Sequence, residues 1–240
     1  MWFSKVRDLG PFKLKVKSSM EKYRADTWQT KEPETIAWID TFKGGTLIDV
    51  GANIGVYSLY AASRGIEVVA IEPHPQNYCR LIENILLNKF SQKILTKMTP
   101  VGAFEDMIMF HVKHSEVGSS GSQITFAIDE YGQGFKPKET LLSPMTTLDK
   151  IIKGVPLSPI HIKIDVDGHE MDVIEGLKSQ WHRVQSILIE VNNTKDIECL
   201  NGLMKSKGLL PDAAINHMKP HSSERRQGLP VNIVYSRSHG

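Results

Sequence analysis

The feature that most constrains the fold is an alternation of apolar and amphipathic segments between residues 46 and 88. Residues 46–50 and 67–72 are short apolar runs, and the first of them ends in a turn that holds Gly51 and Gly55. After each run, apolar side chains recur every three or four residues, which is the period of a helix that covers a core. A strand–helix–strand–helix order predicts a parallel sheet with right-handed crossover connections.

The same alternation continues towards the C-terminus. Residues 160–166 alternate apolar and polar side chains, and residues 187–191 and 231–235 are further strand-like runs. The segment 114–145 is rich in Gly and Ser, which predicts a loop or hairpin. A chain of 240 residues can bury one large core. We therefore predict a single doubly wound α/β domain over residues 30–240, with helices on both faces of a mostly parallel sheet.

The composition is that of an ordinary globular protein. Hydrophobic residues make up 40% of the chain, and 29 Lys and Arg against 27 Asp and Glu give a net charge of +2. No apolar run approaches the ~18 residues that a membrane-spanning helix needs, and the first residues lack the apolar core of a secretory signal. Two cysteines cannot build a disulfide framework. These features argue against disordered, membrane-spanning and disulfide-rich proteins, and we expect a cytoplasmic one.

Positive charge is concentrated at the N-terminus, in a segment that we call the N-terminal arm (residues 1–29). Residues 1–24 contain seven Lys or Arg and two Asp or Glu, so this stretch carries +5 and the remaining chain about −3. Such an arm could contact nucleic acid or an anionic membrane surface. A solvated strand or hairpin is the commoner structure for a segment of this kind.

Acidic side chains at the ends of the first two predicted strands indicate a ligand. The turn Gly51-x-x-x-Gly55, with Asn53 inside it, is not the G-x-G-x-x-G of a dinucleotide-binding turn. Asp49 would repel a pyrophosphate but can pair with an ammonium group, and Glu72 can accept hydrogen bonds from ribose hydroxyls. A nucleoside with positive charge and no phosphate fits both, and S-adenosylmethionine is such a molecule. The alternative is a tight turn with incidental acids.

Two blocks of the sequence resemble the FkbM family of S-adenosylmethionine-dependent methyltransferases. The first block comprises residues 48–58 (IDVGANIGVYS) and 70–75 (AIEPHP), and the second is residues 163–170 (KIDVDGHE). Asp167 stands where glutamate is commoner in that family. The resemblance covers roughly residues 46–192. It implies a Rossmann-like class I methyltransferase fold, usually of seven strands, that methylates a hydroxyl group of a carbohydrate or other secondary metabolite.

The resemblance also implies roles for the residues at the predicted cofactor site. Asp49, Gly51, Asn53 and Gly55 would line the methionine end of S-adenosylmethionine, and Glu72 would hold its ribose. The acceptor would be a small molecule or a glycan. The segment 114–145 would then cover the acceptor site as an insertion, and the N-terminal arm is a second candidate for such a cover.

Two residues of the second block are our candidates for catalysis. Methyl transfer to an alcohol needs a base or a metal in addition to alignment. Asp165 and His169 follow a strand at the edge where ligands bind in open α/β sheets, and an imidazole can exchange a proton near neutral pH. The alternative is that Asp165 caps the next helix and that His169 is an exposed surface residue.

A divalent metal is an option that we do not expect. Asp165, Glu190 and Asn192 lie at or near the ends of neighbouring predicted strands, and their oxygen atoms suit Mg²⁺ or Ca²⁺. The sequence contains no H-E-x-x-H motif, since His169-Glu170 lacks the second histidine.

Two further functions are alternatives to a small-molecule methyltransferase. A nucleic-acid methyltransferase could use the basic arm, but the chain lacks an Asn/Asp-Pro-Pro-aromatic motif for a flipped base, and the charge outside the arm is negative. A catalytically inactive S-adenosylmethionine-binding module is the second alternative.

Overall fold

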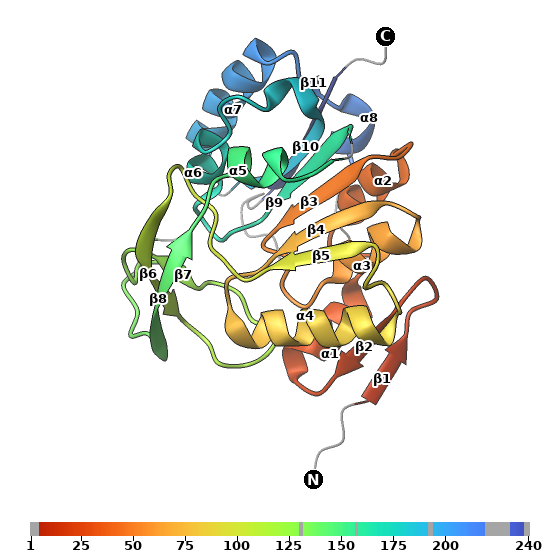
Figure 1. Ribbon diagram of the computed structural model, residues 1–240, viewed down its shortest axis with the longest axis vertical. Coiled ribbons are helices and arrows are strands. Elements are labelled where there is room, and N and C mark those ends of the chain that lie inside the picture. The colour runs from red at the N-terminus through yellow and green to blue at the C-terminus, as the bar shows by residue number, and fades with distance from the viewer. Residues whose placement is uncertain (1–4, 130–131, 157, 192–193, 219–230, 238–240) are drawn as a thin grey trace.

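A mostly parallel sheet forms the centre of the computed structural model, which describes residues 5–129, 132–156, 158–191, 194–218 and 231–237 (Figure 1). In the described residues this sheet has seven strands in the order β11-β12-β10-β9-β3-β4-β5. The strands are β3 (Thr46–Val50), β4 (Glu67–Ile71), β5 (Ile94–Lys97), β9 (Ile160–Ile164), β10 (Val184–Val191), β11 (Leu210–Pro211) and β12 (Val231–Ser236).

The strand directions confirm the predicted fold class. Strands β3, β4, β5, β9 and β10 pair in parallel, and β12 runs antiparallel to both β10 and β11. All five residues of β3 are buried, as are all five of β9, because both faces of the sheet are covered.

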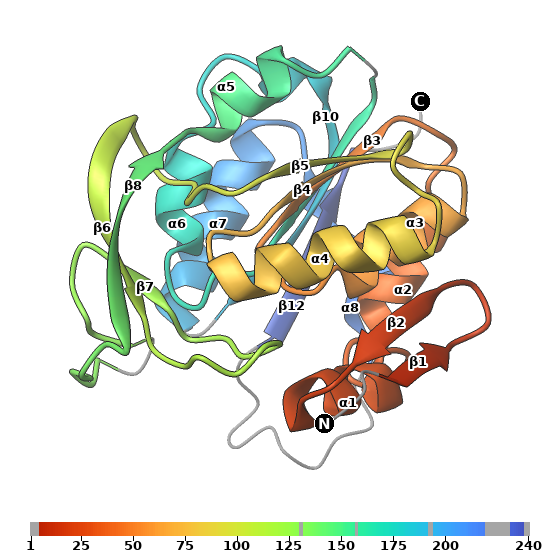
Figure 2. The same cartoon turned by 60° about the horizontal axis from the view of Figure 1, so that its bottom comes forward.

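Helices cover the two faces in two groups (Figure 2). Apolar residues of the first group pack with Leu47 and Val68 of the sheet, and those of the second group pack with Ile48 and Ile162. This alternation along β3 follows from the pleat of a strand, in which successive side chains point to opposite faces. The first group is α2 (Pro33–Asp40), α3 (Val56–Ser63), α4 (Pro75–Leu87) and α8 (Ala213–Asn216), and the second is α5 (Leu148–Lys153), α6 (Glu170–Glu175) and α7 (Thr194–Ser206).

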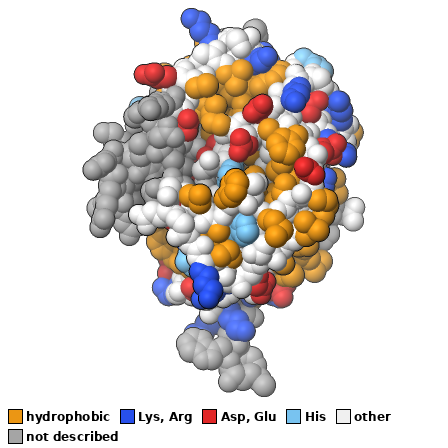
Figure 3. Space-filling model, turned by 90° about the vertical axis from the view of Figure 1, so that its left-hand side faces the viewer, with side chains coloured by type: hydrophobic (Ala, Val, Ile, Leu, Met, Phe, Trp, Pro, Cys, Tyr) orange, Lys and Arg blue, Asp and Glu red, His pale blue; other side chains and the backbone are white. Residues whose placement is uncertain are grey.

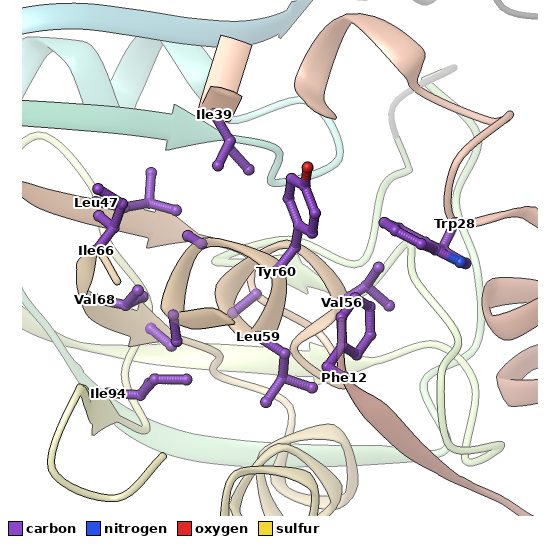
Figure 4. Packing of buried hydrophobic residues seen from close by; sticks show 14 of the residues in the cluster. Phe12, Trp28, Ile39, Leu47, Val56, Leu59, Tyr60, Ile66, Val68 and Ile94 are labelled. Atoms are coloured by element: carbon purple, nitrogen blue, oxygen red, sulfur yellow. The ribbon is translucent and has the colours of Figure 1, made fainter. Parts of the chain in front are cut away.

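The N-terminal arm is folded onto the first group of helices. It forms a hairpin, β1 (Lys5–Asp8) and β2 (Lys13–Val16), followed by α1 (Ser19–Thr27). Phe12 and Leu14 are at most 2% exposed, and the Phe12 ring lies 5.2 Å from that of Trp28, centroid to centroid (Figure 4). A solvated strand or hairpin was the favoured prediction for this segment. The hairpin is present, but its Phe12 and Leu14 side chains are buried rather than solvated.

Asn84 of α4 and Asn88, the residue that caps the C-terminal end of this helix, fasten the arm to the domain. Asn88 accepts a hydrogen bond from the Lys13 amide at 2.7 Å and donates one to the Lys13 carbonyl at 2.7 Å. Asn84 accepts one from the Lys15 amide at 2.9 Å and donates one to the Ile54 carbonyl at 2.9 Å. The arm is therefore joined through α4 to the turn that follows β3.

A small antiparallel sheet lies beside the main one. Its strands are β6 (Asp106–Val112), β7 (Gln123–Ile124) and β8 (Glu139–Met145), in the order β7-β6-β8. The face seen in Figure 3 carries hydrophobic side chains among charged ones, and Met107, Met109 and Leu142 of this sheet are exposed. Among the helices of the described residues, none is long and apolar enough to cross a membrane.

Candidate active site

The carboxyl ends of β3, β4 and β9 bring the two sequence blocks to one cavity. These strands are neighbours in the sheet and run in parallel, so the residues that follow them meet at one edge. The cavity contains about 750 Å³ of space, part of it open to solvent. Of the predicted site residues, its lining includes Gly51, Asn53, Glu72, Asp165 and His169.

The turn after β3 depends on the two glycines that the sequence singled out. Gly51 has a φ of +84°, and a Cβ atom there would overlap the backbone oxygen of Asp165. Gly55 has a φ of +92° and precedes α3, and a Cβ atom there would press on Leu81. Gly51 therefore allows close contact between two strand ends, whereas Gly55 serves packing outside the cavity lining.

Asp49 is a buried carboxyl group with one free oxygen. Its side chain is 1% exposed, and its Oδ2 atom accepts a hydrogen bond from Ser58 at 2.5 Å. Its Oδ1 atom has no hydrogen-bond partner in the described part of the chain. Burial raises the pKa of Asp49, and the Lys163 ammonium opposes this effect. Asp49 does not belong to the cavity lining, but the next two residues along the chain do.

Glu72 is held at the cavity wall by two backbone amides. Its Oε2 atom accepts a hydrogen bond from the Asn53 amide at 2.8 Å, and its Oε1 atom accepts one from the His74 amide at 2.9 Å. Burial raises the pKa of Glu72 to about 7. A carboxylate offers about four lone-pair positions, so two remain for hydroxyl donors of a ligand.

Asp165 forms an ion pair with a lysine that the sequence analysis did not single out. The Lys163 ammonium lies 2.9 Å from Oδ2 of Asp165, and Lys163 is 1% exposed. Although burial acts in the opposite direction, Lys163 holds the pKa of Asp165 well below its usual range. A carboxylate of this kind is a weak base. It can accept a hydrogen bond from a hydroxyl and orient it.

His169 lines the same cavity but does not contact Asp165. One ring nitrogen, Nε2, lies 2.7 Å from Oε1 of Gln123, and Nδ1 lies 3.1 Å from Oδ2 of Asp172. Both ring nitrogens therefore face oxygen acceptors. To take a proton from an acceptor hydroxyl, His169 would have to release one of these two contacts.

A segment that we call the strap (residues 114–123) lies against the cavity. It belongs to the Gly- and Ser-rich segment 114–145 that was expected to cover the acceptor site. The Ser119 carbonyl accepts hydrogen bonds from Asn53 at 2.9 Å and from Asn77 at 3.0 Å. At the other end, the Gly121 amide donates to Oδ2 of Asp167 at 2.6 Å. The strap thereby joins the turn that follows β3 to the second block, at Asp167, the position where aspartate replaces the commoner glutamate.

The N-terminal arm, our second candidate for a cover over the acceptor site, also reaches the cavity. Arg24 of α1 is among the lining residues, and its Nε atom donates a hydrogen bond to the Gly118 carbonyl of the strap at 2.6 Å. The sequence contained no local signal for this contact, because Arg24 and Gly118 are separated by 94 residues.

Two residues of the optional metal site, Asp165 and Glu190, belong to the described part of the chain. No group of three or more His, Cys, Asp or Glu side chains in this part of the chain is placed to hold a metal ion. Asp165 is paired with Lys163, and burial together with the Asp165 charge raises the pKa of Glu190 well above its usual value. Asn192, the third residue of that option, lies outside the described residues.

Comparison with known proteins gives the family. The model of the FkbM methyltransferase domain matches residues 49–219. The hexuronic acid methyltransferase AglP of Haloferax volcanii is 25% identical over 170 residues, covering 68% of this chain and 62% of that protein. Methyltransferase 1 of Beauveria bassiana is 24% identical over 180 residues, covering 68% of this chain and 71% of that protein.

The solved structures agree with the predicted fold. The crystal structure of the methyltransferase FkbM from Methylobacillus flagellatus matches with a TM-score of 0.55 at 14% identity, over 90% of this chain and 52% of that chain. The present chain thus spans between half and two thirds of the length of that structure and of the Haloferax protein. The match of the domain model over residues 49–219 shows that the chain belongs to the FkbM methyltransferase domain family.

Proposed function

We propose that this chain is an S-adenosylmethionine-dependent O-methyltransferase whose acceptor is a hydroxyl group of a carbohydrate or other secondary metabolite. The observation that carries the proposal is the cavity at the carboxyl edge, where the Gly51 turn, Glu72 and Asp165 line one space. Membership of the FkbM family supports the reaction type.

The residues around the Gly51 turn fit the cofactor. A buried acceptor atom without a partner, such as Oδ1 of Asp49, is the environment that a cationic donor would satisfy. The methionine end of the cofactor carries an ammonium and a sulfonium, and its ribose carries two hydroxyl donors for Glu72. The backbone amides of Asn53 and His74 fix Glu72 before the ligand binds, which lowers the cost of ordering it.

When bound, the cofactor supplies an electrophilic methyl group. Asp165 would accept a hydrogen bond from the acceptor hydroxyl and direct its oxygen towards that methyl group, while Lys163 keeps the carboxylate ionised. Alignment of this kind is itself a large part of catalysis. His169 would take up the hydroxyl proton after it releases Gln123 or Asp172. The strap would exclude water from the cavity.

A carbohydrate acceptor is supported by the comparison with AglP. That protein is named a hexuronic acid methyltransferase, and it is similar to this chain over 170 residues. The charge distribution gives less support to a nucleic-acid acceptor, because the ammonium groups of Lys13 and Lys15 in the arm are paired with the carboxylates of Asp8 and Glu83. We expect no metal requirement.

Calorimetry with S-adenosylhomocysteine tests the cofactor assignment. We expect the unmodified protein to bind it, and the E72A variant to lose about 1–3 kcal/mol of binding free energy, because hydrogen bonds to a charged group are removed. The control is D106N, at an exposed position of β6. Absence of binding at millimolar ligand would contradict the proposal.

The acceptor is tested by transfer of a radiolabelled methyl group to a panel of uronic acids, neutral sugars, phenols and transfer RNA. We expect labelling of a sugar or a phenol with the protein and none with the D165N variant. Labelling of the RNA alone would contradict the proposed acceptor class. Labelling that survives exhaustive chelation would agree with a reaction that needs no metal.

A further inference from the structure

Arg24 is an unusual residue in this cavity because of its charge. The other charged residues of the lining are acidic, namely Glu72, Asp165 and Asp167. Among the described lining residues, Arg24 is the one lysine or arginine. It comes from the N-terminal arm, outside residues 49–219 that match the family model.

The position of Arg24 is fixed by contacts along α1. Ser18 caps this helix by accepting a hydrogen bond from the Glu21 amide at 3.0 Å, and Glu21 is fully buried beside Arg80 of α4. Glu116 of the strap accepts hydrogen bonds from the amide and the hydroxyl of Ser19, at 3.0 and 2.6 Å. The helix is thus held on two sides, and Arg24 is presented to the cavity one turn further along.

The guanidinium of Arg24 has capacity for a ligand. Its Nε atom donates to the Gly118 carbonyl at 2.6 Å. Within the described part of the chain, its two terminal nitrogens make no hydrogen bond or ion pair. A guanidinium presents these nitrogens as a planar fork that matches a carboxylate in bidentate geometry.

The neighbours of Arg24 show at which end of the cavity this residue lies. Arg24 holds the Gly118 carbonyl, and Asn53 holds the next one, that of Ser119. Because consecutive Cα atoms are about 3.8 Å apart, the two side chains meet the same short stretch of the strap. Asn53 belongs to the turn that we assign to the methionine end of the cofactor. Arg24 therefore lies at that end.

We infer that Arg24 binds a carboxylate in this cavity, and that this carboxylate is the one of the methionine end of the cofactor. The inference rests on the proposed function. S-adenosylmethionine carries two cationic groups and one carboxylate, and the cavity lining pairs several acids with one guanidinium. A uronic acid acceptor would present the same chemical group, so the experiment must separate the two sources.

Calorimetry with three ligands distinguishes a carboxylate of the cofactor from a carboxylate of the acceptor. S-adenosylhomocysteine contains the amino-acid end, 5′-methylthioadenosine lacks it, and D-glucuronate, added with saturating S-adenosylhomocysteine, stands for a carboxylated acceptor. The variants are R24Q and R24K, and the control is K22Q, which removes a charge from an exposed position of the same helix. A melting curve of each variant without ligand checks the fold.

We expect R24Q to weaken S-adenosylhomocysteine binding about 10- to 100-fold and to leave 5′-methylthioadenosine binding unchanged. R24K should lie between R24Q and the unmodified protein, because it keeps the charge but loses the fork, and K22Q should match the unmodified protein.

Three outcomes would overturn the inference while leaving the proposed function intact. Equal weakening of both nucleosides would mean that Arg24 only supports the strap. Unchanged nucleoside binding with loss of glucuronate binding would assign the residue to the acceptor. No change with any ligand would remove the carboxylate role. Failure of the unmodified protein to bind S-adenosylhomocysteine would instead contradict the proposed function.

Discussion

Lys163 and Asp165 form an ion pair at the carboxyl end of β9, with 2.9 Å between the ammonium nitrogen and the carboxylate oxygen. The lysine is almost fully buried, while the aspartate lines the cavity. Taking two charges out of water costs several kcal/mol, and the attraction within a close pair offsets this cost without adding much net stability. We therefore interpret the main effect of the pair as keeping the Asp165 carboxylate ionised at the site.

The K163M variant should lose about 3 kcal/mol of unfolding free energy, because it leaves the Asp165 carboxylate, whose side chain is only a quarter exposed, without its partner. Addition of D165N should recover part of this loss, since the two residues interact directly. Urea unfolding followed by circular dichroism measures both. The control is K150M, an exposed lysine beside Glu105, which should lose less than about 1 kcal/mol. Equal losses in K163M and K150M would contradict the role of the pair.

The D165N variant should keep cofactor binding and lose turnover. The carboxamide has nearly the shape of the carboxylate, but it cannot hold and polarise an acceptor hydroxyl with a full negative charge. We expect a fall of at least about 100-fold in the turnover number with a change in S-adenosylhomocysteine affinity of less than about threefold. Unchanged turnover would remove Asp165 from the catalytic residues.

Cofactor affinity should depend on pH through Glu72. Its pKa is raised to about 7 by burial, so the group becomes protonated as the pH falls through neutrality. Since the ionised carboxylate accepts ribose hydroxyl bonds better, S-adenosylhomocysteine binding should weaken between pH 8 and pH 6. The E72Q variant should show a flat profile over this range in calorimetry. A slope that is identical in both proteins would assign the pH dependence to another group.

Acid should destabilise the fold through His161, which is stacked on Phe42 at 3.7 Å and bonded to Ser186 at 2.7 Å. Burial lowers its pKa to about 4, from the 6.5 of an ordinary histidine. The unfolded chain therefore binds a proton that the folded chain does not, and stability is lost as the pH falls from about 6.5 to 4.

The H161F variant isolates this effect. The difference in unfolding free energy between pH 7 and pH 4.5 should be smaller than in the unmodified protein by up to about 3 kcal/mol. Urea unfolding at both pH values measures it, and H182Q, at an exposed position, should behave like the unmodified protein. If H161F kept the full pH dependence, burial of His161 would not be its source.

Gly51 should tolerate no side chain. Its φ of +84° is strained for other residues, and a Cβ atom would overlap the Asp165 backbone. We expect G51A to lose more than about 3 kcal/mol. G10A is the matched control, because Gly10 has a φ of +91° and nothing within 4 Å, so it should lose only about 1 kcal/mol. Similar losses of unfolding free energy for G51A and G10A in a thermal unfolding experiment would show that the close contact between Gly51 and the Asp165 backbone does not affect stability.

The main sheet could be predicted because its strands are short apolar runs, and such a run can be recognised from neighbouring residues alone. Residues 46–50 lie between helices on both faces, and their apolar character follows directly from that position. The structure of the N-terminal arm was harder to predict, since its many lysines suggest an exposed segment. Its signal was the alternation of Phe12, Leu14 and Val16 with lysines, which is the pattern of a strand with one buried face.

The hydrogen-bond partners of the strap could not be predicted, although segment 114–145 was expected to cover the acceptor site. Segment 114–123 has no apolar period, and its position depends on side chains far away in the chain, such as Asn53 and Asp167. Hydrogen bonds of this range leave no local pattern. The sequence predicted that His169 and Asp165 lie at the same edge of the sheet. It could not predict that the ring nitrogens of His169 contact Gln123 and Asp172, because these contacts also depend on the folded structure.

The contact between Gly51 and the Asp165 backbone has a consequence for motion. The amide of Asp165 also donates to the Val50 carbonyl at 3.1 Å, so the two halves of the site share a backbone joint at the centre of the sheet. We therefore expect the two halves to move as one rigid body. Opening of the cavity to admit a ligand would then involve the strap and the helix that carries Arg24, and we expect their amides to exchange hydrogen faster than those of the fully buried strands β3 and β9.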